Sequence, residues 1–147
     1  MFYTMQIVEK IVMEKTPHRF VVFQLILVLG MASFFSSAPY AGELNVSIQS
    51  LQGKQAANQN LLLLDVRSVE EFKEGHVRGA VNIPHTELDK IYQLLNRSQE
   101  KQRIVYCRSG KRAGIVLDAM REKGLTDLYH LEGDMIGWKG AGLPVEK

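Results

Sequence analysis

Hydrophobic residues beyond residue 43 fall into short runs of strand length, which polar or periodic segments separate. The runs cover residues 44–48, 61–66, 79–84, 103–107 and 128–131. The runs at 61–66 and 103–107 are almost continuously apolar, as is typical of strands with both faces buried. The run at 79–84 is expected to be another buried strand, which Pro84 ends. The first and last runs predict shorter strands.

Helix signals lie between these runs. Residues 50–60 are polar and are expected to be helical. Ser68 and Glu71 have the Ser-x-x-Glu spacing of a capping box, which reciprocally satisfies two backbone donors at a helix start. This spacing predicts a short helix through Glu74 that Gly75 ends.

Two longer helices are indicated by apolar residues that recur on one face. The first is expected over residues 87–97 with Thr86 as its N-cap. The second is expected over residues 109–123, and Gly124 ends it. A short helix and a tail are expected over residues 133–145. The inward-facing positions are Leu88, Ile91, Leu94 and Leu95 in the first helix and Ala113, Val116, Leu117 and Met120 in the second.

The alternation of strands and helices with short links favours an α/β fold. We expect a mostly parallel sheet of about five strands with helices on both faces. In such sheets, ligands bind beyond the carboxyl ends of the strands. Cys107 falls at such an end.

An apolar segment near the start of the chain predicts a targeting signal. Residues 20–35 are almost wholly apolar, with basic residues before them and small residues after them. This pattern is typical of a secretory signal peptide, here residues 1–41, followed by a single domain over residues 42–147. The run would span only about 24 Å as a helix, less than a bilayer core. We therefore expect a periplasmic protein, with an N-terminal anchor facing the periplasm as the alternative.

Composition narrows the function classes. The chain has 147 residues, of which 46% are hydrophobic, and a net charge of +2. Such a small charge gives no reason to expect a nucleic-acid partner. The chain has one cysteine, which excludes an internal disulfide and a multi-thiolate metal site. The histidines show no metal-ligand spacing, so we expect no metal.

The lone cysteine opens the segment "CRSGKR", Cys107 to Arg112, between a strand and a helix. Backbone N–H groups in such a turn can form a concave anion site, and Gly110 gives the turn conformational freedom. The helix dipole and three cationic side chains favour the thiolate, which is the reactive form of cysteine. We expect an exposed thiolate that attacks a substrate directly and needs no histidine partner. The alternative is a buried structural cysteine.

Three segments carry a resemblance to a known family: "LLLLDVRSVEEFKEGHVRGAVNIP", "IVYCRSGKRAG" and "LEGDMIGWKGAGLPV". Together they resemble the rhodanese superfamily, specifically its secreted single-domain thiosulfate sulfurtransferases. The resemblance implies a five-stranded parallel sheet flanked by helices. It implies that Cys107 is the catalytic nucleophile and carries sulfane sulfur as a persulfide. The substrate-binding residues that it implies are Arg108, Ser109, Gly110, Lys111, Arg112 and Arg67.

The resemblance also implies roles for individual residues. The amides of the loop after Cys107 would cradle the outer sulfur, and its cationic side chains would attract thiosulfate. Arg67 would reach the rim of the active site, whereas Asp65, Glu71 and His76 would be mainly structural. Two positions depart from the family pattern Leu-Glu-Gly-Gly-x-x-x-Trp. Asp134 replaces the second glycine, and Gly137 stands where alanine is common.

The function expected from this resemblance is transfer of sulfane sulfur from thiosulfate to cyanide or a thiol acceptor, by a monomer without a cofactor. Two alternatives stay open. One is a sulfur-carrier or sulfide-sensing protein that serves a protein partner. The other is an arsenate or phosphatase-like enzyme on the same scaffold, although the related phosphatases have a loop one residue longer than the six residues of this chain.

Overall fold

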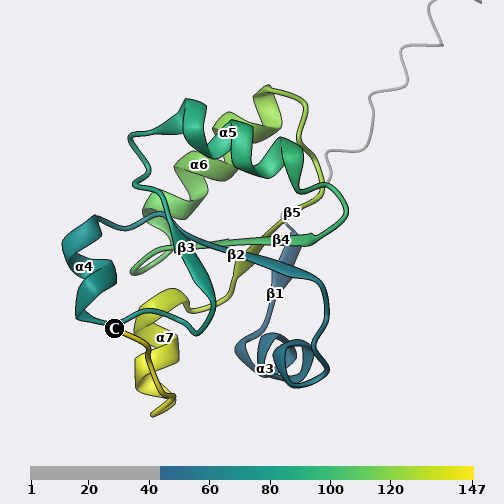
Figure 1. Ribbon diagram of the computed structural model, residues 1–147. Coiled ribbons are helices and arrows are strands. Elements are labelled where there is room, and N and C mark those ends of the chain that lie inside the picture. Colours follow the sequence, from purple (N-terminus) through teal and green to yellow (C-terminus); the bar gives the residue numbers. More distant parts are fainter. Residues whose placement is uncertain (1–43) are drawn as a thin grey trace, which may run out of the picture. The chain divides into compact units, whose positions relative to one another are not determined.

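The computed structural model describes residues 44–147, and the predicted signal peptide or anchor at residues 1–41 lies outside this part (Figure 1). Within residues 44–147, no helix is long and apolar enough to cross a membrane. The elements, in chain order, are β1 (Leu44–Val46), α3 (Ile48–Ala56), β2 (Leu61–Asp65), α4 (Val69–Glu74), β3 (Ala80–Asn82), α5 (Leu88–Arg97), β4 (Gln102–Tyr106), α6 (Lys111–Glu122), β5 (Leu128–Leu131) and α7 (Asp134–Gly140).

The five strands form one sheet in the order β1-β5-β4-β2-β3. Every neighbouring pair runs parallel, so the predicted α/β fold is confirmed. Strand β4 lies at the centre of the sheet. Its residue Val105 pairs with Leu64 of β2 on one side and with His130 of β5 on the other. The residue that follows β4 therefore emerges at the middle of the carboxyl edge of the sheet.

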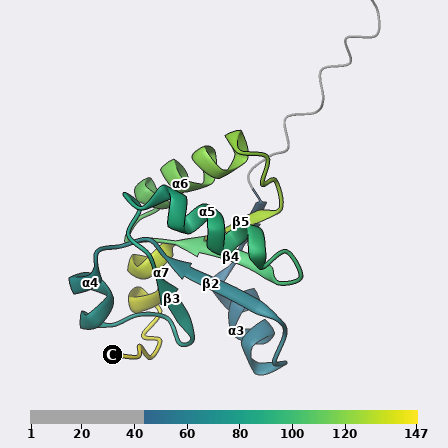
Figure 2. The same ribbon diagram turned by 45° about the horizontal axis from the view of Figure 1, so that its top comes forward.

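Helices cover both faces of the sheet, as Figures 1 and 2 show. Side chains alternate across a strand, so Val105 packs in the core beneath α5 and α6 while Ile104 packs in the core with α3 and α7. All of the inward-facing positions predicted for α6 are buried. The apolar face predicted for α5 is also confirmed, with Ile91 and Leu95 buried and Leu88 and Leu94 packed against the same core.

Two predictions about this scaffold were wrong. The run at 79–84 was expected to be a buried strand, but β3 has three residues at the edge of the sheet and Val81 is 43% exposed. An edge strand has one neighbour, so its pattern of burial differs from that of a central strand. The predicted N-cap of α5, Thr86, is also wrong, because the N-cap is Glu87. The Glu87 amide donates to the Pro84 carbonyl at 2.8 Å and closes a turn, so the helix begins one residue later.

The local signals around the site are confirmed. The capping box at Ser68 and Glu71 is complete, with hydrogen bonds of 3.3 and 3.2 Å in its two directions. Gly75 ends α4 with a φ of 148°, and a Cβ there would lie 2.8 Å from Val145 Cγ2. These contacts hold α4 at the carboxyl edge of the sheet, beside the loop that follows β4 (Figure 1).

Candidate active site

Cys107 directly follows β4 at the centre of the carboxyl edge, as the sequence predicts. The expected exposure is wrong, because Cys107 is only 1% exposed. Its side chain continues the strand alternation and packs in the same core as Val66 and Ala113, and the Gly110 amide of the following loop lies against its sulfur. The sulfur therefore does not lie at an open surface.

The loop holds the sulfur with a backbone donor. The Gly110 amide donates to Cys107 Sγ at 3.2 Å. Gly110 has a φ of +90°, a conformation that favours glycine, and it is the N-cap of α6. The amides of Lys111 and Arg112 occupy the first turn of that helix, where amides have no intrahelical partner and the dipole is positive. This end of α6 is thus suited to negative charge on the sulfur.

Two hydrogen bonds pin the loop to α7. The Met135 amide donates to the Cys107 carbonyl at 3.2 Å, and the Ile136 amide donates to the Arg108 carbonyl at 3.1 Å. The first turn of α7 therefore fixes the position of the nucleophile's backbone.

Arg112 is bound to Glu71 by two short hydrogen bonds of 2.6 and 2.8 Å. This pairing lowers the pKa of the Glu71 carboxyl from 4.5 to about 2. The same carboxylate, and more weakly the Cys107 thiol, raise the pKa of Arg112. Arg112 thus lies beside the sulfur, but its guanidinium is already paired with the Glu71 carboxylate of α4.

Arg67 is buried and bonded to Asp65, with its Nε 3.0 Å from each carboxylate oxygen, and it also donates to the Gly75 carbonyl at 2.9 Å. Burial lowers the pKa of Arg67, but the hydrogen bond and charge of Asp65 outweigh it, so the net shift is upward. Asp65 therefore has the structural role that the resemblance implies.

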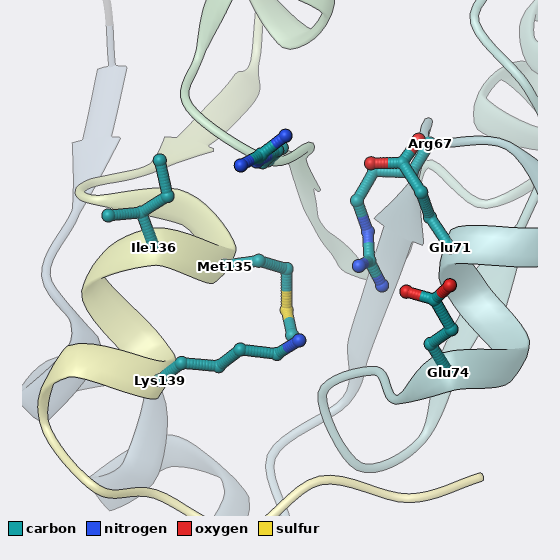
Figure 3. Close-up of a pocket in the computed structure, with 7 residues that line it drawn as sticks. Arg67, Glu71, Glu74, Met135, Ile136 and Lys139 are labelled. Carbon is teal, nitrogen blue, oxygen red and sulfur yellow. The ribbon is translucent and has the colours of Figure 1, made fainter.

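A cleft of about 490 Å³ opens beside this loop. In Figure 3, the side chains of α4 form one wall and those of α7 the other, with Arg67 between them. The lining residues are Arg67, Glu71, Glu74, Arg108, Met135, Ile136 and Lys139. Arg67 and Arg108 therefore come together as the sequence predicts.

The structure places other residues differently from the sequence prediction. The predicted nucleophile Cys107 and the predicted loop residues Ser109, Gly110, Lys111 and Arg112 are not among the described residues that line the cleft. The sequence analysis missed four residues that line the cleft: Glu74, Met135, Ile136 and Lys139. The spacing of Met135 and Lys139, four positions apart on one helix, was the signal that places Lys139 on the same face as the cleft wall.

Two histidines near the site have packing partners. His76 stacks on Phe72 at 3.6 Å between ring centroids, and its Nδ1 lies 3.0 Å from the Phe72 carbonyl. His130 Nε2 lies 3.1 Å from Oδ2 of Asp134. Asp134 Oδ1 in turn accepts a hydrogen bond from the Cys107 amide at 2.7 Å. Asp134, which the sequence marked only as a departure from the family pattern, therefore holds the backbone of the nucleophile.

No group of three or more metal-ligating side chains was found within residues 44–147.

The sequence and the fold of this chain are similar to those of known proteins. Residues 47–141 match the pattern of the rhodanese-like domain. A protein from Synechocystis sp. named as uncharacterized is 35% identical over 104 residues, which cover 70% of this chain and 57% of that protein. A Bacillus subtilis protein named as a candidate sulfurtransferase is 32% identical over 99 residues, covering 67% of this chain and 93% of that protein.

A solved structure is also similar. The human single-domain sulfurtransferase superposes with a TM-score of 0.55 at 29% identity, covering 67% of this chain and 97% of that one. The domain match includes the cysteine loop, both walls of the cleft and all strands except β1. On this match and this geometry, the chain belongs to the rhodanese-like domain family.

Proposed function

We propose that this protein is a sulfurtransferase that moves the outer sulfur of thiosulfate to cyanide or a thiol through a persulfide on Cys107. The observation that carries the proposal is the Gly110 amide, which donates to Cys107 Sγ at 3.2 Å at the start of α6. A donor in this position stabilises an anionic sulfur before and after transfer. Membership of the rhodanese-like family and the names of two similar proteins support a transfer of sulfur.

The first half-reaction needs no external oxidant. The Cys107 thiolate attacks the outer sulfur of thiosulfate and forms a new S–S bond. The bond between that outer sulfur and the sulfonate sulfur breaks, and its electron pair leaves with sulfite. The outer sulfur remains on Cys107 as a persulfide. The negative charge then resides on the terminal sulfur, near the N-terminal end of α6, where the helix dipole is positive.

In the second half-reaction, an acceptor attacks the terminal sulfur. Cyanide takes it as thiocyanate, and a thiolate takes it as a persulfide. The electron pair of the broken S–S bond returns to Cys107, which regenerates the thiolate. Arg108 and Lys139 line the cleft, and their charges attract the thiosulfate dianion.

The pairing of Arg112 counts against the phosphatase-like alternative. A phosphate is best gripped by an arginine that offers two parallel N–H donors. Both terminal nitrogens of Arg112 already donate to Glu71, at 2.6 and 2.8 Å. The short loop and this engagement favour a sulfur-sized group over a phosphoryl or arsenate group.

One observation favours the sulfur-carrier alternative for the acceptor half-reaction. Ile136 lines the cleft and is 56% exposed. An exposed apolar side chain at a reaction site suits an acceptor larger than cyanide, such as a protein thiol. Faster turnover with a protein thiol than with cyanide would favour this alternative.

Steady-state kinetics test the proposal. Because sulfite leaves before the acceptor reacts, varying thiosulfate at several cyanide concentrations should give parallel double-reciprocal lines. The variant Cys107→Ser should form no thiocyanate. Intersecting lines, or thiocyanate formed by Cys107→Ser at the wild-type rate, would reject the persulfide route.

We further propose that residues 1–41 direct export to the periplasm and that the remaining chain acts there as a monomer. The basic, apolar and small-residue order of the segment supports export. Fractionation of the native host should give a periplasmic protein whose mass begins at Gly42. Recovery of the uncut chain in the membrane fraction would support the anchor instead, and recovery in the cytoplasm would reject both.

A further inference from the structure

Asp134 is a buried carboxylate in a backbone conformation that favours glycine. It is 2% exposed, it carries a carboxylate, and its φ is +51°. Among residues 44–147, the other non-glycine residue with a positive φ is Asn58, which is exposed. A glycine would adopt this backbone conformation without strain. Strain that persists at a reactive centre points to a function.

The contacts of Asp134 all converge on the cysteine loop. Its Oδ1 accepts from the Cys107 amide at 2.7 Å, and its Oδ2 lies 3.1 Å from His130 Nε2. A Cβ built on Gly110 would lie 3.2 Å from Asp134 Oδ2 and 3.2 Å from His130 Cε1. The carboxylate of Asp134 and the imidazole of His130 thus pack against Gly110 on the side where a Cβ would point.

This arrangement connects both ends of the hydrogen bond to the sulfur. Asp134 holds the amide of Cys107, which carries the sulfur, and it packs beneath Gly110, whose amide donates to that sulfur at 3.2 Å. His130 fixes the second oxygen, so the carboxylate has one orientation.

We propose that Asp134 is a positioning residue that sets the distance between the Gly110 amide and the Cys107 sulfur. The inference rests on the proposed function for its effect on turnover. Asp134 does not contact the substrate in this account, so its removal should lower the maximal rate of persulfide formation and leave the affinity for thiosulfate nearly unchanged.

Three variants separate this role from relief of strain. Asp134→Asn keeps an oxygen acceptor and a residue type that tolerates positive φ. Asp134→Gly keeps the backbone conformation but removes the acceptor. Asn58→Gly is the matched control, because it relieves a positive φ far along the chain from the cysteine loop. Circular dichroism establishes that each variant is folded.

The readout is sulfite release in a single turnover with thiosulfate in excess. We expect Asp134→Gly to lower the maximal rate at least tenfold, with the half-saturating thiosulfate concentration changed less than threefold. Asp134→Asn and Asn58→Gly should stay within threefold of the wild type. A maximal rate for folded Asp134→Gly within twofold of the wild type would overturn the proposal, as would an equal loss in Asp134→Asn.

A second measurement does not depend on thiosulfate or on a folded variant. Hydrogen exchange of the wild-type Cys107 amide should be as slow as that of the Val66 amide, which donates to Tyr106 in the core. Exchange of the Cys107 amide at the rate of an exposed amide would overturn the proposal. If the wild type releases no sulfite but protects this amide, the proposed function fails while the positioning contact stands.

Discussion

The ion pair between Glu71 and Arg112 gives a sharp test of the site's electrostatics. The substitution Glu71→Gln removes the charge and keeps the capping box, since glutamine also serves at that position. The two side chains are 29% and 25% exposed, so the pair is partly shielded from water. Glu71→Gln should therefore cost more stability than the loss of a fully exposed pair.

The magnitude follows from the pKa of Glu71, which falls from 4.5 to about 2. A shift of that size corresponds to about 3 kcal/mol at most, at 1.36 kcal/mol per unit. Partial exposure lets solvent screen the pair, so we expect about 1–2 kcal/mol. Because the folded-state pKa is depressed, this contribution is complete above pH 4.5 and is lost as the pH falls toward 2.

Urea unfolding of the purified wild type and Glu71→Gln, at a series of pH values, measures this contribution. The matched control is Asp118→Asn, which breaks the more exposed pair with Arg121 on α6. At pH 7, Glu71→Gln should lower the free energy of unfolding by about 1–2 kcal/mol and the control by a few tenths. The difference between wild type and Glu71→Gln should narrow below pH 4. Equal losses in the two variants, or a difference that widens in acid, would show that the pair of Glu71 and Arg112 does not stabilise the fold in this way.

Three further predictions follow from the site. Gly110→Ala should lower turnover at least tenfold in a thiocyanate assay, since its φ is +90° and the new Cβ would press on Asp134 and His130 at 3.2 Å. Lys139→Ala should raise the KM for thiosulfate about two- to fivefold through loss of one attracting charge, while Lys101→Ala at the other end of β4 should not change it. Alone, Gly137→Ala should not raise the free energy of unfolding, because the new Cβ would lie 3.2 Å from Ile48 Cδ1. Combined with Ile48→Val, which removes that atom, it should raise the free energy of unfolding by about 0.5 kcal/mol or more, because alanine favours the helix. Urea titrations measure both effects, and an equal effect in the two backgrounds would contradict this.

Much of the scaffold was predictable because it depends on local signals. Leu61–Asp65 reads as a buried strand from its apolar run, and the capping box at Ser68 marks a helix start. Cys107 was placed at the carboxyl end of a parallel strand from the alternation of elements alone. The positive φ of Gly110 follows from a glycine in a tight strand-to-helix turn.

Other features depend on contacts between distant segments, and so could not be predicted. Asp134 meets the Cys107 amide across 27 positions, which requires β5 to lie beside β4 and α7 to fold back. The burial of Cys107 depends on how the loop and α6 pack over it. The exposure of Val81 depends on the position of β3 at the edge of the sheet, which the apolar run did not reveal.

In the proposed cycle, Cys107 carries sulfur between two half-reactions. The most direct measurement is the intact mass of the purified protein before thiosulfate, after thiosulfate and after subsequent cyanide. We predict a gain of one sulfur atom that cyanide removes and that Cys107→Ser never acquires. No gain on fully reduced wild-type protein, or a gain that persists in Cys107→Ser, would contradict the account.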